Sequence, residues 1–564
     1  MNTHRCILLA GLFLLALVPR LYSAVTLGWN WDRPGSFTLV NFDEGGSCRA
    51  ALDGFTYSPL TGYQTIAITS LLGYPPPEGV RGNASAVKAY CHSPQHIRVA
   101  RVHSAVLGAL TAVAVALLTL QLMPAHPGAA WFAAGLVAVS GFHISQSQSG
   151  TVDAPSTFFI YALLACVAWA LRRRSAVTLA CSIPLLVAAV WTKFWAFALF
   201  AYLPFLPPRC WTVLREGWGD LRIVLLVLAV AVWMAALSNQ DFSPNWWFAP
   251  LAAYALVVPW NRLRVPLVVW WLLLPALLWL LLTRVGLVHT YTMGIEGTAF
   301  GSGYADIGAN KWLRNLVNLP AVLLVGLGIP ACLLLFAGCR YLYREQDNTR
   351  LWLVLLPVAG FALFMAFLAP VTYYRHYLPL LPGAAIVIAA GAASSGWLRR
   401  PWLALAVLGW SALLAWDMVS DYHNDPRREL RPWFAARPAA TAYFSYYVNP
   451  PPGTRVALFR PEYAAGDAAS LRQADYVILS ENWYDTAFAN ELNGPRTDVL
   501  ERLVKTTPAH ALFYRRALAG ENPLLEEVQA FELPHFMPEL LLHRAAYGNF
   551  QLFVGDLRIF RVRH

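Results

Sequence analysis

The chain has 564 residues, of which 57% are hydrophobic and only 13% are charged. Its formal net charge is +11, but the arginines cluster in short segments between apolar runs, which indicates membrane orientation and argues against a nucleic-acid partner. Apolar runs of about 17 to 25 residues, enough to cross a hydrocarbon core of about 30 Å, recur as far as Met418. This composition excludes an ordinary soluble protein and predicts a mainly α, polytopic membrane protein.

About thirteen transmembrane helices are predicted. They cover residues 6–26, 98–122, 128–145, 152–171, 175–191, 194–206, 222–238, 246–260, 265–284, 317–340, 351–369, 377–393 and 401–418. The first run is short and follows a basic segment, so a cleaved signal peptide is the alternative to a retained helix. Lys193 leaves open whether its two flanking runs form one kinked span.

Basic residues mark one side of the membrane. Alternate loops contain Arg172, Arg173 and Arg174; Arg209, Arg215 and Arg222; Arg262 and Arg264; Arg340, Arg344 and Arg350; and Arg399 and Arg400. By the positive-inside rule these loops, and the N-terminus with Arg5, are cytoplasmic. The long first loop and the C-terminal tail then face outward. Abundant Ala, Leu, Arg and Trp are typical of a GC-rich bacterium, which suggests an inner membrane and a periplasmic tail.

Two domains are predicted. They are a transmembrane domain over 1–420, whose first outer loop covers 28–97, and a small extracytoplasmic α/β domain over 421–564. Within the loop, Thr61 to Leu72 is expected to form an amphipathic helix at the membrane surface. The tail is expected to form strands over Thr454–Phe459, Ala474–Ser480 and Gln551–Val562. Because no glycine-rich phosphate loop accompanies these strands, a nucleotide site is not expected.

An acidic pair, Asp43 and Glu44, lies in the polar segment Asn41–Gly46 shortly after the first span. Charges are rare in this chain, so two adjacent acids beside a membrane require an explanation. A carboxylate there can serve as a catalytic base on the outer face. The alternative is that the pair only caps an interfacial helix or turn.

Further polar residues are predicted at the same outer face: His143, Asp153, Lys193, Tyr374, Arg375 and His376. Lys193 and Arg375 can bind a phosphate there, although cations at helix ends also extend harmlessly to water. His143 can ligate a metal or orient a carboxylate, and its alternative role is a local hydrogen bond.

Of the eight cysteines, only Cys48 and Cys91 fall in an outer loop. In an oxidising compartment they can form a disulfide across that loop, but their spacing leaves the pairing open. The chain has no Cys-x-x-Cys or His/Cys spacing of a structural zinc site.

Several segments in order resemble the C-type (GT-C) glycosyltransferases, in particular the protein O-mannosyltransferases and the bacterial aminoarabinose lipid A transferases. The matching segments are Asp43-Glu44, Arg98 to Gly108, Ser140 to Ser145, Gly150 to Asp153, Thr192 to Trp195, and Tyr374 to Pro382. Each segment alone is a weak signal. Their order, their spacing and their common outer face together make the resemblance specific, and it extends over the whole chain.

The resemblance implies an inverting glycosyltransferase that uses a polyprenyl-phosphate sugar. Asp43 would be the catalytic base, with Glu44 and Asp153 as further acids of the site. Lys193 and Arg375 would bind the lipid phosphate, and Tyr374, His376 and His143 are further donor-binding candidates. Whether the site binds a divalent metal ion stays open, and Glu44, Asp153 and His143 are the candidate ligands. The partners would be the lipid bilayer, the donor lipid and an acceptor that is a protein, lipid A or a glycan.

The sequence departs from both named families near the acidic pair. It lacks the His that soon follows the pair in the mannosyltransferases and the Arg-Tyr that commonly follows it in the lipid A transferases. The acceptor therefore stays open. The alternatives are a transporter or flippase of polyprenyl-linked or amphiphilic substrates, a membrane scaffold, and an oligosaccharyltransferase. The Trp-Trp-Asp motif of the last is absent, since Phe248 follows Trp246-Trp247 and Leu272 follows Trp270-Trp271.

Overall fold

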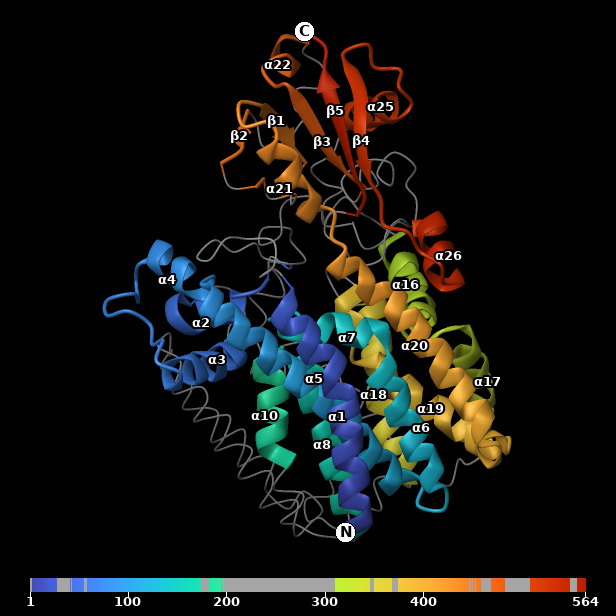
Figure 1. Cartoon of the computed structure of the whole chain (residues 1–564). Coiled ribbons are helices and arrows are strands. Elements are labelled where there is room, and N and C mark those ends of the chain that lie inside the picture. The colour runs from blue at the N-terminus through green and yellow to red at the C-terminus, as the bar shows by residue number, and fades with distance from the viewer. Residues whose placement is uncertain are drawn as a thin grey trace.

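The fold is a helical bundle with a sheet domain beyond one of its ends, whereas the N-terminus lies at the other end (Figure 1). The structure is a computed structural model that describes residues 3–27, 41, 43–54, 58–173, 182–193, 196, 310–344, 349–367, 374–445, 448, 450–451, 453–457, 468–481, 508–547 and 555–564. Apart from Ala196, the spans predicted over 194–206, 222–238, 246–260 and 265–284 lie outside these residues.

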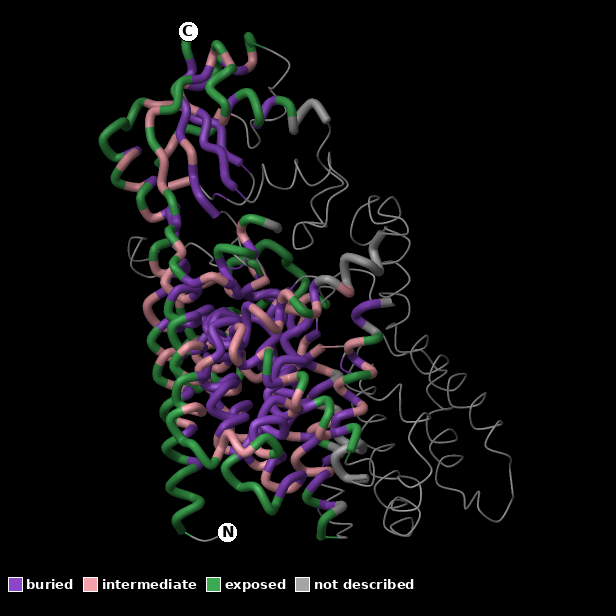
Figure 2. Tube along the Cα trace, turned by 90° about the vertical axis from the view of Figure 1, so that its right-hand side faces the viewer, coloured by how far each residue is buried: buried purple, intermediate pink, exposed green. Residues whose placement is uncertain are grey.

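The bundle is built from apolar helices. They are α1 (Thr3–Thr26), α5 (Pro94–Leu122), α6 (Pro127–Val139), α7 (Gly141–Ser147), α8 (Asp153–Arg173), α10 (Ser182–Thr192), α16 (Asn310–Leu327), α17 (Ile329–Arg344), α18 (Thr349–Phe367), α19 (Leu380–Ser394) and α20 (Pro401–His423), with the 3₁₀ turns η6 (Tyr374–Tyr377) and η7 (Trp397–Arg399). Figure 2 shows buried residues through the middle of the bundle. Glycines allow close contact there: a Cβ on Gly338 of α17 would lie 2.0 Å from Val387 O of α19.

The helices make this chain an integral membrane protein. Within the described residues, four helices are long and apolar enough to cross a membrane, or six if two bent pairs each count as one span. The predicted number of thirteen spans is therefore not confirmed.

The span predicted over 128–145 is two helices, α6 and α7, bent by 58°. Ser140 separates them with extended backbone angles, φ −66° and ψ 118°. Its hydroxyl oxygen accepts a hydrogen bond from His143 N (3.3 Å) and donates one to Gly326 O of α16 (2.7 Å). Ser140 thus ends α6, caps α7 and ties the break to a neighbouring helix.

The single helix expected over 317–340 is also two helices, α16 and α17, bent by 118°. Gly328 at the break has φ +87°, and a Cβ there would lie 2.8 Å from Trp410 Cδ1. Glycine therefore permits both the turn and the close contact. A carboxylate of the tail, Glu539 Oε1, accepts a hydrogen bond from Ile329 N (2.8 Å) and so caps α17.

The first outer loop contains three short helices, α2 (Gly46–Asp53), α3 (Leu60–Leu71) and α4 (Ala84–Cys91). Helix α3 confirms that a helix is present where one was predicted over 61–72, whereas its place at the membrane surface stays a prediction. Ile68, Leu71 and Leu72 at its end are exposed apolar side chains. Such side chains are suited to the headgroup region of a bilayer.

The tail forms a five-stranded mixed sheet. Its strands are β1 (Thr441–Phe444), β2 (Arg455–Val456), β3 (Tyr476–Ser480), β4 (Leu525–Phe531) and β5 (Leu557–Val562), and its helices are α21 (Arg427–Ala435), α22 (Ala468–Leu471), α25 (Pro508–Leu518) and α26 (Pro538–Tyr547). The strand order is β2-β1-β3-β5-β4. Strand β1 pairs in parallel with β2 and β3, whereas β5 is antiparallel to β3 and β4.

Both faces of this sheet are covered, because neighbouring strand residues point to opposite sides. Tyr443 lies on the side of the sheet that α25 covers, and Phe444 lies on the side that α21 covers. The strand predicted over Ala474–Ser480 is present as β3. Among the described residues, the one predicted over Thr454–Phe459 is present as β2, and the one predicted over Gln551–Val562 is present as β5 from Leu557. Strands β1 and β4 were not predicted.

Helix α26 fastens the tail to the bundle, where it lies beside α16 and α20 (Figure 1). Trp410 Nε1 of α20 donates a hydrogen bond to Glu539 Oε1 of α26 (2.6 Å). Asp417 Oδ2 of α20 accepts hydrogen bonds from Phe536 N and Met537 N, just before α26 (2.9 and 2.7 Å). The tail is therefore held at one particular end of the bundle.

Candidate active site

The acidic pair lies in a tight turn that opens α2. Asp43 N donates a hydrogen bond to Asn41 Oδ1 (2.9 Å) and Glu44 N donates one to Asn41 O (3.1 Å). Gly45 follows with φ +81°, and a Cβ there would lie 2.7 Å from His92 Cδ2. Only glycine fits this position, because other residues disfavour positive φ and also need the space. The turn therefore fixes where the two carboxylates point.

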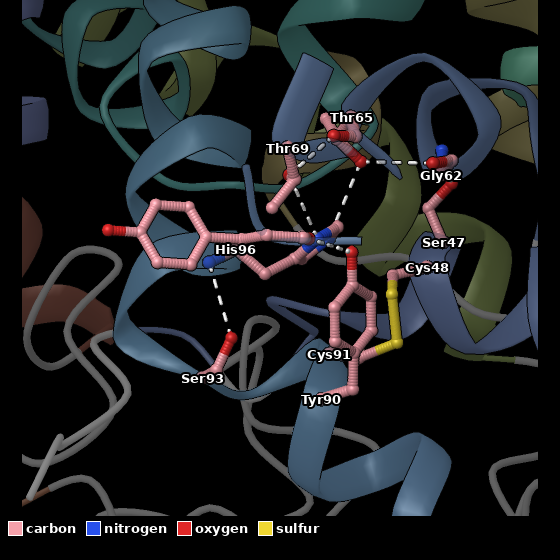
Figure 3. The surroundings of a disulfide bond; sticks show 10 residues. Ser47, Cys48, Gly62, Thr65, Thr69, Tyr90, Cys91, Ser93 and His96 are labelled. Carbon is pink, nitrogen blue, oxygen red and sulfur yellow. Dashed lines mark hydrogen bonds between the residues drawn. A yellow bond between two sulfur atoms is a disulfide. The ribbon is translucent and has the colours of Figure 1, made fainter. Parts of the chain in front are cut away.

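A disulfide between Cys48 and Cys91 supports this turn by joining α2 to α4, and their Cα atoms are 5.7 Å apart (Figure 3). The pairing that the sequence left open is thus present. Helix α2 also packs closely on α3, since Gly62 N donates a hydrogen bond to Ser47 Oγ (2.8 Å). The same Ser47 oxygen lies 2.6 Å from Thr61 Oγ1. The acidic turn is therefore attached to helices that a disulfide and hydrogen bonds hold together.

Glu44 is fully buried in a two-pronged ion pair with Arg101 of α5. Arg101 Nε donates to Glu44 Oε1 (2.7 Å) and Arg101 Nη2 donates to Oε2 (2.8 Å). Gly150 N also donates to Oε1 (3.0 Å), and Arg101 donates to Leu27 O at the end of α1. Burial alone would raise the pKa of Glu44, but the Arg101 charge and these hydrogen bonds hold the pKa below its usual value. Glu44 thus stays ionised and joins the loop to three parts of the bundle.

Asp43 has a different environment from its neighbour. Its Oδ2 lies 2.7 Å from Arg375 Nη2 of η6, and its side chain is 30% exposed against 15% for Arg375. Glu44 is buried in the structure's interior, whereas Asp43 remains accessible from outside. Of the two acids, Asp43 is therefore the one that a substrate can reach.

A second ion pair extends the site inward. Asp153, the first residue of α8, pairs with Lys193, which directly follows α10. Asp153 Oδ2 also lies 4.0 Å from Arg375 Nε and has no hydrogen-bond partner within the described part of the chain. Two carboxylates and two cations thus form a continuous chain from Lys193 through Asp153 and Arg375 to Asp43. Four distant segments contribute one residue each.

The tail touches the site through Tyr374, the residue before Arg375. Tyr374 is buried, and its hydroxyl lies 2.9 Å from His543 Nε2 of α26, with the two rings edge to face. His376 lies on the other side of Arg375 in the same 3₁₀ turn and is half-buried. The position of Arg375 is thus coupled to the docking of the tail domain.

His143 belongs to a separate buried network. Its Nδ1 lies 3.1 Å from Arg20 Nη2 and 3.2 Å from Ser147 Oγ. Arg20 of α1 also donates hydrogen bonds to Ala138 O and Val137 O (2.9 Å each), at the end of α6. Because both side chains are fully buried, this network holds α1 against the α6–α7 break. These contacts agree with the local hydrogen-bonding alternative for His143.

The candidate metal ligands Glu44, Asp153 and His143 do not form one cluster. Glu44 is saturated by donors, Asp153 pairs with Lys193, and His143 faces Arg20. Asp43 and Asp153 each face a cation, so a divalent ion would have to displace Arg375 or Lys193. The donor set therefore fits a metal poorly at this position. In the part of the chain that the structure describes, three potential ligands gather elsewhere, at Asp417, Asp421 and His535.

Several residues that build the site were not predicted from the sequence. Arg101, the partner of Glu44, was noted only as part of a matching segment, and Arg20 and His543 were not singled out. A signal existed for both arginines, because a charge inside an apolar span is a functional candidate by default. Nothing in the sequence pairs His543 with Tyr374, since that contact depends on how the tail docks.

The bundle of apolar helices with its docked tail sheet identifies the chain as an integral membrane protein. The archaeal oligosaccharyltransferase AglB from Archaeoglobus fulgidus, in complex with an inhibitory peptide and a dolichol-phosphate, has a similar fold. The TM-score is 0.51 at 12% sequence identity, over 95% of this chain and 74% of that one. The apo form of the Archaeoglobus fulgidus oligosaccharyltransferase gives a TM-score of 0.48 at 12% identity, over 98% and 76%. No protein-family model and no curated protein matches the chain.

Proposed function

We propose that this protein is a membrane-bound inverting glycosyltransferase that moves a sugar from a polyprenyl-phosphate donor to a hydroxyl group. The observation that carries the proposal is the accessible Asp43–Arg375 pair, joined to Asp153 and Lys193 within a GT-C fold. The reaction needs a carboxylate to take a proton and cations to receive a phosphate. The site holds both within one chain of contacts.

Asp43 serves as the base in this proposal. The acceptor oxygen attacks the anomeric carbon as its proton passes to the Asp43 carboxylate and the bond from that carbon to the phosphate oxygen breaks. Because the acceptor attacks opposite the leaving group, one displacement inverts the anomeric configuration. Arg375 and Lys193 stabilise the phosphate that leaves, as pre-placed cations do for developing negative charge.

The ion pair between Asp43 and Arg375 implies that the donor must bind before Asp43 can act on the acceptor. While Arg375 holds the Asp43 carboxylate at 2.7 Å, the guanidinium group occupies the carboxylate oxygen that an acceptor hydroxyl would need to contact. A lipid phosphate is a strong, two-pronged partner for a guanidinium group. Donor binding therefore draws Arg375 toward the phosphate and frees Asp43. The acceptor then meets an active base only when the donor is in place.

Asp153 and Glu44 act through other residues in this proposal. Asp153 pairs with Lys193, and its Oδ2 lies 4.0 Å from Arg375 Nε. Asp153 therefore lies between the two cations and fixes their positions relative to each other. Glu44 fixes the turn that carries Asp43 through its pair with Arg101. Tyr374 and His376 flank Arg375 and set its approach to the donor.

A lipid phosphate donor has further support from the similar fold, since the AglB structure contains a dolichol-phosphate. We propose residues 1–420 as the catalytic transmembrane domain and 421–564 as an extracytoplasmic domain that helps to bind the acceptor. The membrane proposed is a bacterial inner membrane with a cytoplasmic N-terminus. The acceptor is a protein, lipid A or a glycan. The AglB complex contains a peptide, which favours testing a protein first.

The proposal is tested by mass spectrometry of the lipids that the purified protein retains. Wild type, Asp43→Asn and Glu78→Gln are incubated with extracted polyprenyl-phosphate sugars and candidate acceptors. Glu78 is an exposed acid of the same loop and serves as the matched control. Wild type and the control should accumulate bare polyprenyl phosphate, whereas Asp43→Asn should retain the sugar-charged lipid. Transfer of intact charged lipid across a vesicle membrane by all three proteins would instead favour the transporter or flippase alternative.

A further inference from the structure

Three metal-ligating side chains meet where the tail docks on α20. Asp417 and Asp421 lie four residues apart on α20, and therefore on one face of that helix. His535 comes from the segment between β4 and α26. One ligand atom from each side chain lies within 4.8 Å of the other two. This cluster shares no residue with the proposed active site.

The distances in the cluster are compatible with metal coordination, although the shorter one also meets the criterion for a hydrogen bond. His535 Nδ1 lies 3.3 Å from Asp417 Oδ1 and 3.7 Å from Asp421 Oδ2. Ligands that bind a tetrahedral zinc ion at about 2.0–2.2 Å are about 3.4 Å from one another. Good N–H···O hydrogen bonds are about 2.7–3.2 Å long. One imidazole nitrogen between two carboxylates at these spacings leaves room for a shared cation.

Asp421 supplies an independent reason to expect a cation. The side chain is 4% exposed, and its Oδ2 contacts His535 Nδ1 at 3.7 Å, beyond the range of a good hydrogen bond. A buried carboxylate is costly unless a hydrogen-bond donor, a cation or a proton compensates it. Arg544 is the neighbouring cation of the tail, but it is already engaged by Glu481 and Asp556. The cluster is therefore short of positive charge.

The other carboxylate of the cluster is already oriented. Asp417 Oδ2 accepts hydrogen bonds from Phe536 N (2.9 Å) and Met537 N (2.7 Å). Its Oδ1 forms a hydrogen bond with His535 Nδ1 at 3.3 Å, which a bound ion would replace. Hydrogen bonds that fix a ligand in this way are typical of the second shell of metal sites.

We propose that Asp417, Asp421 and His535 bind a divalent transition-metal ion of the zinc class. The ion would link α20 to the segment that leads into α26. Because α26 contains both Glu539, which caps α17, and His543, which contacts Tyr374, the metal would hold the tail in register with the bundle. Two carboxylates and one imidazole are a suitable ligand set for such an ion, with a fourth position left for water. This inference does not depend on the proposed transferase activity.

The test uses the full-length protein, stripped with a chelator and then titrated with Zn²⁺ against a chromophoric competitor. Bound metal is counted by inductively coupled plasma mass spectrometry after desalting. The variants are Asp421→Asn and His535→Gln, and Glu526→Gln, an exposed acid of β4, is the control. Wild type and control should bind about one equivalent, and each ligand variant should bind at least about tenfold more weakly, since even second-shell changes cost that much. Co²⁺ in wild type should give the visible absorption of a four-coordinate ion.

Two outcomes would overturn the inference. One is the absence of stoichiometric binding in wild type, which would mean that Asp421 is compensated by a proton. The other is equal zinc affinity in all variants, which would mean that the metal binds adventitiously elsewhere. If Asp421→Asn does not fold, His535→Gln and the Co²⁺ spectrum of wild type still decide the question.

Discussion

Arg375 Nη2 lies 2.7 Å from Asp43 Oδ2, although Asp43 belongs to the first outer loop and Arg375 to a 3₁₀ turn late in the bundle. The contact closes a chain of charges that begins at Lys193 and passes through Asp153. Within this chain the side chain of Asp43 is 30% exposed, whereas that of Asp153 is 1% exposed. This difference separates an acid that a substrate can reach from one that positions its neighbours.

Replacing Arg375 tests its role at the donor phosphate. Arg375→Gln should lower kcat/KM for sugar transfer by about 10²–10³, the loss expected when one donor to a developing anion is removed. Arg375→Lys should recover only part of this loss, because an ammonium group cannot make the two-pronged contact. Transfer rates at several donor concentrations measure the effect. Arg81→Gln, an exposed arginine of the first loop, is the control, and a fully active Arg375→Gln enzyme would refute the assignment.

Replacing Glu44 should act mainly by lowering the free energy of unfolding, and not directly on the transfer reaction. Glu44→Gln leaves Arg101 buried and without a full counter-charge, so the free energy of unfolding should fall by about 3–5 kcal/mol. Asp43→Asn, at a partly exposed pair, should cost no more than about 1 kcal/mol. Denaturant unfolding of both variants in detergent measures the difference. Equal stability of the two variants would contradict the positioning role of Glu44.

The Glu44 pair also predicts a pH dependence. Because its pKa is lowered in the folded state, the stabilisation is present above the unfolded pKa of about 4.3 and is lost as the pH falls through the folded pKa. Wild type should therefore lose stability below about pH 4.3 more steeply than Glu44→Gln does. Thermal unfolding as a function of pH measures this. Parallel curves for the two proteins would argue against an ionised, buried Glu44.

The disulfide should stabilise the loop that carries the catalytic turn. Exchanging Cys48 and Cys91 together for serine should cost about 2–4 kcal/mol of loop stability. Proteolysis within 28–97 and transfer activity measure the effect. A reducing agent should weaken wild type and the control Cys339→Ser, which removes an exposed free cysteine, but not the double variant. Resistance of wild type to reduction, with full activity, would contradict the prediction.

The contact between Tyr374 and His543 should couple the tail to the site. Tyr374→Phe removes one hydrogen bond of about 0.5–1.5 kcal/mol and should slow transfer a few-fold without unfolding the protein. His543→Ala should have a similar effect, and the double variant should be no slower than the worse single one. Full additivity of the two changes would show that the residues act independently.

The sequence predicted the long membrane helices more accurately than the positions at which helices bend. Long apolar runs predict α1, α5, α8 and α20 well, because length and hydropathy alone decide whether a helix can span. The 118° bend at Gly328 depends on contacts with Trp410 and Glu539, which no local pattern encodes. Strands β1 and β4 were missed for a related reason, since short strands acquire their stability from neighbours distant in the chain.

The candidate site shows the same difference between residues that the sequence indicates and contacts that only the tertiary structure creates. Asp43 and Arg375 were selected as rare charges near an outer face, and the structure brings them into contact. The different environments of Asp43 and Glu44 could not be predicted, because adjacent residues in a turn can point to opposite surroundings. Likewise Asp421 and His535 are brought together only by the docking of the tail on α20.

The most direct test of the proposed function compares the lipid products of wild type, Asp43→Asn and Glu78→Gln in the presence of an acceptor. General-base catalysis predicts that Asp43→Asn transfers sugar about 10²–10⁴-fold more slowly while it still binds the charged donor. Wild type and Glu78→Gln should both convert donor to bare polyprenyl phosphate and a glycosylated acceptor of inverted configuration. Wild-type turnover by Asp43→Asn, or the absence of any polyprenyl-phosphate product from wild type, would contradict the proposed function.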